Sequence, residues 1–282
     1  MTVLMDIRSY FDSQIKKINN ALNGYLPKAS EYPSKIHEAM RYAVLAGGKR
    51  IRPIFALAAC EAAGGDEKKV LPAACALELI HNYSLIHDDL PCMDDDDTRR
   101  GQPTCHKKFG EDTALLAGDA LLTLAFGILS RPNDHVAAKD LTKQMEIIHL
   151  IAEAIGTHGM VGGQQVDMEF QATEVDLPTI EYINTHKTGA LIAASVKTGA
   201  TLGGATKKKT ECLHRYGKYT GLLFQIMDDI LDQEGYAKVI GVPEAKKEAE
   251  KILLKAKKEL KPFGRRGDAL SRIADFVLER KY

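Results

Sequence analysis

The chain has 282 residues, of which 45% are hydrophobic and 27% are charged, and its 38 basic residues balance its 38 acidic ones. This balance argues against binding to nucleic acid or to a membrane surface through bulk charge. The length would allow two domains, but one large helical domain fits equally well. Because no repeat, low-complexity tract or linker-like region divides the sequence, we predict a single domain over residues 1–282.

The cysteines and the longest apolar segment argue against three further classes of protein: disulfide-rich, zinc-binding and membrane-spanning. The five cysteines are odd in number, widely spaced and free of any C-x-x-C pair, which argues against a disulfide framework and a zinc site. They favour a reducing, cytoplasmic location. The apolar segment 114–129 is shorter than a bilayer span and contains Asp119. We interpret it as a central core helix and expect no membrane span.

Apolar residues at helical spacing dominate the chain. From Leu4 to Leu22 they alternate with charged residues, which predicts an amphipathic helix and not a signal peptide. Steps of three and four residues predict further helices over 36–45, 51–63, 70–86, 114–129 and 145–155. Breaks are expected at Gly47–Gly48, Gly64–Gly65, 131–134, Gly162–Gly163 and Gly203–Gly204. Since no convincing alternation with a period of two occurs, we predict an all-α protein of about ten or more helices.

Two acidic segments each follow apolar helical sequence. In LIHDDLPCMDDDDTRRG (residues 85–101), six aspartates lie within ten residues and two arginines follow. In FQIMDDILD (224–232), Asp228 and Asp232 are four residues apart and would share one face of a helix. Aspartates in such apolar sequence must be paired, protonated or bound to a cation. Oxygen ligands from two helices suit Mg²⁺, which takes its remaining ligands from water and substrate phosphates.

Each acidic segment has an ordinary alternative. A single run of aspartates is more often a solvated turn, and the presence of two similar segments weakens that explanation. A calcium loop lacks its required glycine and glutamate. Cations that could bind phosphate lie in GGKRIRP (47–53) and at Arg99–Arg100. For GGKRIRP alone, a helix C-terminus with basic residues is an adequate explanation.

Six segments in this order resemble those of the trans-isoprenyl diphosphate synthase family, with the bacterial farnesyl diphosphate synthases the most similar: GGKRIRP, HNYSLIHDDLPCMDDDDTRRGQPTCH, GDALL, GMVGGQQVDME, HKTGALI and FQIMDDILD. The resemblance implies the isoprenoid synthase fold, in which helices surround a central cavity, and usually a homodimer. It also implies a Mg²⁺-dependent prenyltransferase. Such an enzyme condenses dimethylallyl and then geranyl diphosphate with isopentenyl diphosphate to give farnesyl diphosphate.

The resemblance assigns a role to individual residues. Three Mg²⁺ ions, with Mn²⁺ as an alternative, would be held by Asp88, Asp89, Asp94, Asp228 and Asp232. The allylic diphosphate would be bound by Arg99, Lys187, Thr188 and Gln225. Isopentenyl diphosphate would be bound by Lys49, Arg52, His81 and Arg100, and the substrate-binding set also includes Tyr83 and Ser84. Ionisation of the allylic diphosphate would depend directly on Asp88, Asp94, Arg99, Lys187 and Asp228.

Four polar or aromatic residues have competing explanations. His81 lies about two helical turns before Asp88 and so faces the same side, although a hydrogen-bonded core histidine explains it as well. In the family, an aromatic residue at the position of Tyr83 accompanies a fifteen-carbon product, because the ring could close the tunnel; core packing is the alternative. A polar core network would explain Gln164 and Asp119, and we leave Asp119 out of the site.

The chain departs from the family after the second acidic segment. Where the family has a flexible stretch with a further lysine, Asp232 to Gly235 leads directly to Tyr236. About twenty residues, a length typical of an active-site lid, are missing near 234–236. If the deletion is genuine, a catalytically weak regulatory subunit is one alternative. A geranylgeranyl diphosphate synthase is another, and a Mg²⁺-dependent terpene cyclase or head-to-head coupling enzyme is a third.

Overall fold

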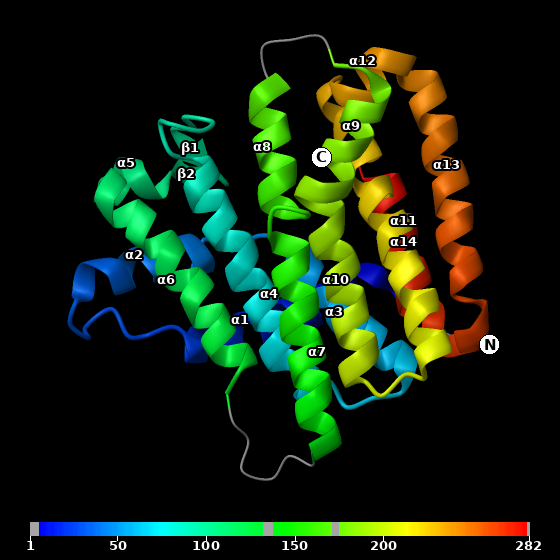
Figure 1. Cartoon of the computed structure of the whole chain (residues 1–282), viewed down its shortest axis with the longest axis horizontal. Helices are drawn as coiled ribbons and strands as arrows, with labels where there is room; N and C mark the ends of the chain where they lie inside the picture. Colours follow the sequence, from blue (N-terminus) through cyan, green and yellow to red (C-terminus); the bar gives the residue numbers. More distant parts are fainter. Residues whose placement is uncertain (1–5, 132–137, 171–174, 281–282) are drawn as a thin grey trace. The chain divides into compact units, whose positions relative to one another are not determined.

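The computed structural model describes residues 6–131, 138–170 and 175–280, and this part of the chain is almost entirely helical (Figure 1). The α-helices are α1 (Ile7–Tyr25), α2 (Ser34–Leu45), α3 (Ile51–Ala63), α4 (Glu67–Asp88), α5 (Cys105–Phe109), α6 (Glu111–Leu129), α7 (Ala138–Ile155), α8 (Met160–Phe170), α9 (Leu177–Ile183), α10 (Ala190–Leu202), α11 (Lys207–Asp232), α12 (Gly235–Ile240), α13 (Val242–Glu259) and α14 (Asp268–Glu279). A π-helical segment, η1 (Asn184–Gly189), precedes α10, and a 3₁₀ segment, η2 (Lys261–Gly267), precedes α14. The all-α prediction is confirmed.

The predicted helices over 36–45, 51–63, 70–86, 114–129 and 145–155 correspond to α2, α3, α4, α6 and α7. The predicted N-terminal helix is α1, which begins at Ile7; Leu4 lies outside the described residues, as do 132–134 of the expected break at 131–134. One element was not expected. The strands β1 (Thr98–Arg99) and β2 (Gln102–Pro103) form a short antiparallel hairpin, with Arg99 opposite Gln102.

Contacts between residues divide the chain into two compact units. Unit 1 comprises Met1–Tyr10, Phe55–Val70 and Ala137–Tyr282, and unit 2 comprises Phe11–Ile54 and Leu71–Val136. Three of the four boundaries fall inside α1, α3 and α4. The single domain over 1–282 stays a prediction, and each unit is described by itself.

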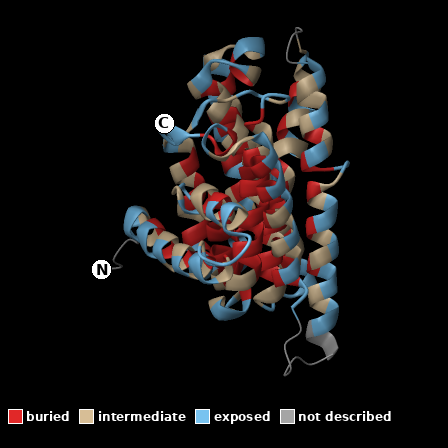
Figure 2. Cartoon of the chain, turned by 90° about the vertical axis from the view of Figure 1, so that its left-hand side faces the viewer, coloured by how far each residue is buried: buried red, intermediate tan, exposed pale blue. Residues whose placement is uncertain are grey.

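In unit 1, the long helix α11 packs against α10, α13 and α14. Its Tyr216 is fully buried, meets the ring of Phe55 edge-on at 6.3 Å and donates a hydrogen bond to the carbonyl of Leu270 at 2.6 Å. The helices in Figure 2 turn exposed residues toward the solvent and buried residues inward. On α11 and α13, the buried residues likewise recur at helical steps along one side. The last two turns of α11 carry the second acidic segment, so this packing holds Asp228 and Asp232 on a rigid element.

In unit 2, α4 carries the first acidic segment at its C-terminal end. Residues on several sides of α4, including Leu77, Leu79 and Ile80, are completely buried, so the helix belongs to the interior of the protein. The helix ends at Asp88, three residues before Pro91, as expected from the inability of proline to donate a backbone hydrogen bond. Helices α2 and α5 both pack against α6.

Helix α6, which we interpreted as a central core helix, is only partly buried. It buries one side, but Leu115 is 47% exposed and Leu116 is 55% exposed. Within the described parts of the chain, α6 is the one helix whose length and hydropathy would allow a membrane span, and 44% of its most apolar window is buried.

The expected break at Gly162–Gly163 is wrong, because both glycines lie inside α8. A Cβ atom on Gly163 would lie 2.2 Å from the backbone nitrogen of Lys187. The glycine therefore allows α8 and η1 to approach each other closely, and it does not end a helix. The other expected breaks at Gly47–Gly48, Gly64–Gly65 and Gly203–Gly204 each follow a helix.

Candidate active site

The first acidic segment continues from α4 as a compact turn. The backbone N–H of Asp94 donates to the carbonyl of Asp88 at 2.8 Å, and that of Asp95 donates to Leu90 at 3.2 Å. These bonds return the chain to the end of α4. The structure therefore brings together the backbones of Asp88 and Asp94, two predicted metal ligands that are six residues apart.

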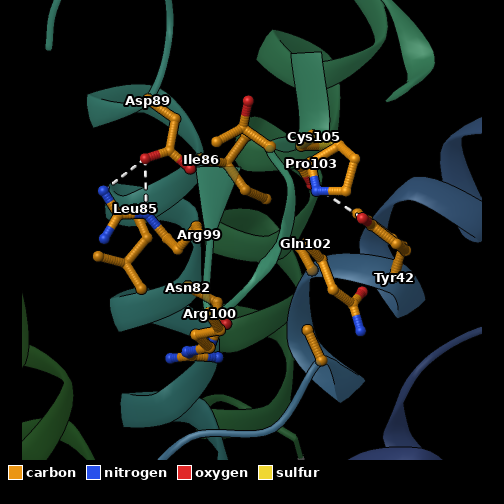
Figure 3. A pocket seen from close by; sticks show the side chains of 13 residues that line it. Tyr42, Asn82, Leu85, Ile86, Asp89, Arg99, Arg100, Gln102, Pro103 and Cys105 are labelled. Atoms are coloured by element: carbon orange, nitrogen blue, oxygen red, sulfur yellow. Dashed lines mark hydrogen bonds and ion pairs between the residues drawn. The ribbon is translucent and has the colours of Figure 1, made fainter. Parts of the chain in front are cut away.

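Asp89 has a different partner, Arg99 of β1. The Asp89 side chain is 4% exposed, and its Oδ1 accepts from both Nε and Nη2 of Arg99 at 2.6 Å (Figure 3). Asp96, which is 49% exposed, also accepts from Arg99 at 2.9 Å. Burial raises the pKa of Asp89, while the positive charge of Arg99 acts in the opposite direction. Asp89 as a metal ligand stays a prediction, and the contact shows that it fixes the guanidinium of Arg99.

If Arg99 binds the allylic diphosphate, as the resemblance implies, replacing Asp89 with alanine is expected to weaken that binding. Loss of a buried, charge-assisted contact predicts an increase of about tenfold or more in KM for the allylic substrate. Asp96→Ala is the matched control, because it removes a more exposed partner of the same arginine and is expected to change KM much less. A rise in the Mg²⁺ concentration that gives half of the maximal rate would show that Asp89 is also a metal ligand, as the sequence predicts. An unchanged concentration would leave Asp89 with the contact to Arg99 alone.

The hairpin carries Arg100 to the turn that follows α2. The Arg100 side chain donates to the carbonyl of Gly47, and β1 and β2 border a small pocket with α2 and α4 (Figure 3). Asn82 and Tyr42 also line this pocket, and the Tyr42 hydroxyl donates to the carbonyl of Pro103 at 2.8 Å. Two segments that the sequence identified separately, 47–53 and 99–100, therefore meet in unit 2.

A buried ion pair, which sequence reasoning missed, holds the GGKRIRP segment in place. Arg50 is 2% exposed, and its Nη1 lies 2.8 Å from Oε1 of Glu78 on α4. Arg50 also donates to the carbonyl of Val44 at 2.6 Å and to Asn19 at 2.9 Å. The Arg50 side chain therefore stabilises the turn between α2 and α3, which also contains Lys49.

His81 lies within a cluster of arginines. Burial is the largest cause of a pKa well below the usual value for histidine, and the positive charges of Arg52, Arg100, Arg50 and Arg99 lower it further. The imidazole is therefore neutral near pH 7. Arginines from 50–52 and 99–100 produce a local field that favours an anion. Thus three predicted ligands of isopentenyl diphosphate, Arg52, His81 and Arg100, are brought together. Ser84 donates to the carbonyl of His81 at 3.0 Å.

The second acidic segment lies at the end of α11 in unit 1. Asp228 Oδ1 is 2.8 Å from Nη2 of Arg280, whose side chain is 5% exposed. The Arg280 guanidinium also lies over the ring of Phe224, 4.0 Å from its centroid. Sequence reasoning missed Arg280, because one arginine near the end of α14 forms no recognisable pattern. Asp232 is exposed on the same helix.

Lys187 and Thr188 lie in the π-helical segment η1, a conformation that is frequent at functional sites. Lys187 Nζ is 2.5 Å from Oδ2 of Asp167 on α8, so this predicted phosphate ligand has an anionic partner in unit 1. Gln164 lies one turn before Asp167. Its two amide atoms are buried and have no hydrogen-bond partner among the described residues, so the polar core network considered for Gln164 is absent there.

Gln225 is positioned by a network that the sequence did not reveal. Its Nε2 donates to Oδ1 of Asn184 at 3.3 Å, and Asn184 Nδ2 donates to Asp229 at 3.1 Å. Asp229 also accepts from the backbone N–H of Tyr236 at 3.0 Å. Burial raises the pKa of Asp229, whereas these hydrogen bonds lower it. Asp229 therefore joins α11 to α12 directly where the family was expected to have its longer loop.

The donor set fits Mg²⁺ delivered with a phosphate group. Carboxylate oxygens are the protein ligands that this ion prefers, and one or two of them commonly suffice when phosphate and water complete the coordination. Over the described ranges, no three or more His, Cys, Asp or Glu side chains already gather in a metal-binding arrangement. Asp88 and Asp94 of unit 2, and Asp228 and Asp232 of unit 1, stay predicted ligands of Mg²⁺, with substrate phosphates and water completing its coordination.

Comparison with known proteins identifies the family. A family model described as polyprenyl synthetase matches residues 33–249. Geranylgeranyl pyrophosphate synthase 4 of Arabidopsis thaliana is 44% identical over 282 residues, which cover 92% of this chain and 73% of that protein. Dimethylallyltranstransferase of Fischerella ambigua is 39% identical and covers 98% of this chain.

A solved structure gives the same result. The apo structure of an FPP/GFPP synthase from Zymomonas mobilis has a TM-score of 0.90 and 38% sequence identity, and the alignment covers 96% of this chain and 98% of that one. These matches confirm the resemblance inferred from the six segments and the isoprenoid synthase fold. The chain belongs to the polyprenyl synthetase family and is a trans-prenyltransferase.

Proposed function

We propose that the protein condenses isopentenyl diphosphate with dimethylallyl and then geranyl diphosphate, and that farnesyl diphosphate is its main product. The main support is the arginine cluster around His81, which lies in the same unit as Asp88 and Asp94. A reaction between two diphosphates needs cationic side chains to bind each of them. A cyclase, which has a single diphosphate substrate, does not need a second group of cationic side chains. Retention of both acidic segments argues against an inactive subunit.

In the proposed mechanism, the residues act mainly through charge and position. Mg²⁺, when bound by the acidic segments, would supply positive charge to the departing diphosphate. Arg99 and Lys187 stabilise the same developing charge through hydrogen bonds. Lys49, Arg52 and Arg100 hold isopentenyl diphosphate so that its double bond attacks the allylic cation. The C–O bond to diphosphate breaks, a C–C bond forms, and the released diphosphate accepts the proton that is lost from the new chain.

The proposed chain length rests on Tyr83. This residue is 7% exposed on α4, five residues before Asp88. Burial, and then the charge of Asp88, raises the pKa of the phenol to about 12, so the ring is neutral and suited to contact a hydrocarbon chain. A geranylgeranyl diphosphate synthase is the second candidate, because several relatives carry that name.

Replacing Tyr83 with alanine is expected to lengthen the product. Removal of the ring leaves space for at least one more isoprene unit, so the main product should change from fifteen to twenty or more carbons. Liquid chromatography with mass spectrometry of dephosphorylated products measures this change. An unchanged profile would mean that Tyr83 packs in the core without limiting the product.

We also propose a homodimer in a reducing, cytoplasmic compartment. The exposed apolar side chains of α6, Leu115 and Leu116, would be covered by a second copy of the chain. The five cysteines are free, as expected for a reducing environment. Light scattering of the purified protein measures the oligomeric state, and a monomer at micromolar concentration would contradict the dimer.

The function is tested by incubation with dimethylallyl and isopentenyl diphosphates and Mg²⁺. A prenyl diphosphate that forms only with both substrates supports the proposal, and Mn²⁺ in place of Mg²⁺ tests the metal preference. A hydrocarbon formed from one substrate would identify a cyclase. A folded protein without turnover would support the regulatory subunit, for which the short connection between α11 and α12 is the structural reason.

A further inference from the structure

The ring of Tyr83 contacts the ring of His87, one turn later on α4. Their centroids are 5.7 Å apart with an angle of 77° between the planes, an edge-to-face arrangement. Such aromatic pairs favour one relative orientation over others. His87 therefore restricts the position of Tyr83 from the side of the acidic segment.

His87 is itself held by α6. Its Nε2 lies 3.0 Å from the carbonyl oxygen of Leu115, and because a carbonyl only accepts, Nε2 carries the hydrogen. Asp119 Oδ1 lies 3.9 Å from the same nitrogen. The imidazole thus bridges Tyr83 on α4 and the backbone of α6 within unit 2.

Gly118 provides the space that this arrangement requires. A Cβ atom at Gly118 would lie 2.1 Å from Nε2 and 2.5 Å from Cδ2 of His87. Any larger residue would force the imidazole away from its hydrogen bond to Leu115. At Gly127, on the same helix, an added Cβ atom would meet no other part of the described chain within 4 Å.

We infer that His87, seated on Gly118 and Leu115 of α6, is a positioning residue that fixes Tyr83 and thereby limits the length of the prenyl product. The inference rests on the proposed function and deepens it, since it adds a second helix to the determinants of chain length. His87 acts through Tyr83, and its removal is expected to alter which chain lengths are accepted more than how fast the diphosphate ionises.

The test compares product profiles of matched variants of the full-length protein. Gly118→Ala is expected to change the ratio of twenty-carbon to fifteen-carbon product by about tenfold. Gly127→Ala makes the same chemical change on the same helix and is expected to leave the wild-type ratio intact. His87→Ala is expected to favour the longer product, and His87→Gln, which places a donor near the Leu115 carbonyl, should restore part of the wild-type ratio.

A double variant separates the proposed contact from general effects on α6. In the His87→Ala background, Gly118→Ala no longer meets an imidazole and should have no further effect on the ratio. Equal ratios in Gly118→Ala, Gly127→Ala and wild type would overturn the inference and leave the proposed function intact. If Gly118→Ala does not fold, the product ratio of His87→Ala is the deciding measurement. A ratio of twenty-carbon to fifteen-carbon product equal to that of the wild type would then overturn the inference. Absence of any prenyl product from the wild type would overturn both.

Discussion

Asp88→Ala is expected to lower kcat by at least about a thousandfold, because a loss of about 4 kcal/mol in stabilisation of the transition state corresponds to that factor. Asp88 is the last residue of α4, and its backbone carbonyl accepts a hydrogen bond from the N–H of Asp94. We assign the carboxylates of these two residues to the metal, and the substitution removes one of them. Steady-state rates with saturating substrates, measured over a range of Mg²⁺ concentrations, test the expectation.

Asp95→Asn is the matched control for the acidic turn. Asp95 has a positive φ of 51°, which asparagine adopts readily, and it carries the same charge as Asp88 in the same turn. Its replacement is expected to reduce kcat less than about tenfold. A near-normal rate for Asp88→Ala, or an equal loss in both variants, would contradict the assignment of Asp88 to the metal.

Glu78→Ala is expected to cause the largest loss of stability. It leaves the guanidinium of Arg50, which is 2% exposed, without its carboxylate partner inside unit 2. Breaking a buried pair in this way typically costs about 3–5 kcal/mol. The turn that holds Lys49 and Arg52 should loosen as well, so that KM for isopentenyl diphosphate increases. Thermal unfolding by circular dichroism and steady-state kinetics measure the two effects.

Glu244→Ala is the control for this variant, because it also removes a glutamate from an ion pair of 2.8 Å. The pair of Glu244 with Lys247 lies on the surface of α13, where both side chains are more than half exposed. Exposed pairs of this kind add little to stability. Similar unfolding temperatures for Glu78→Ala and Glu244→Ala would show that the buried pair is not required.

Sequence patterns predicted those features that depend on residues close together in the chain. Segment 51–63 matches α3 because its apolar residues recur at helical steps and two glycines follow. Asp228 and Asp232 lie on one helix, as their spacing indicated. The six segments sufficed to identify the family, since several of them are long and their order is retained.

Contacts between distant residues could not be predicted in the same way. Arg50 and Glu78 are 28 positions apart, and neither residue differs locally from an ordinary surface charge. The same holds for Arg280 and Asp228. The hairpin at Thr98–Pro103 is too short to show a periodic pattern of apolar residues. The pair Gly162–Gly163 resembles a helix break in composition, but Gly163 is needed because the backbone of Lys187 approaches it closely. In each case the decisive partner lies elsewhere in the sequence.

The central claim is that both acidic segments serve one reaction, the ionisation of an allylic diphosphate for attack by isopentenyl diphosphate. The most direct measurement is product analysis by mass spectrometry after incubation with both substrates, with and without a chelator, for wild type, Asp88→Ala and Asp228→Ala. The account predicts a prenyl diphosphate from the wild type with Mg²⁺ alone, and at least about a thousandfold less from either variant. Wild-type amounts of product from either variant, or product that persists with the chelator, would contradict it.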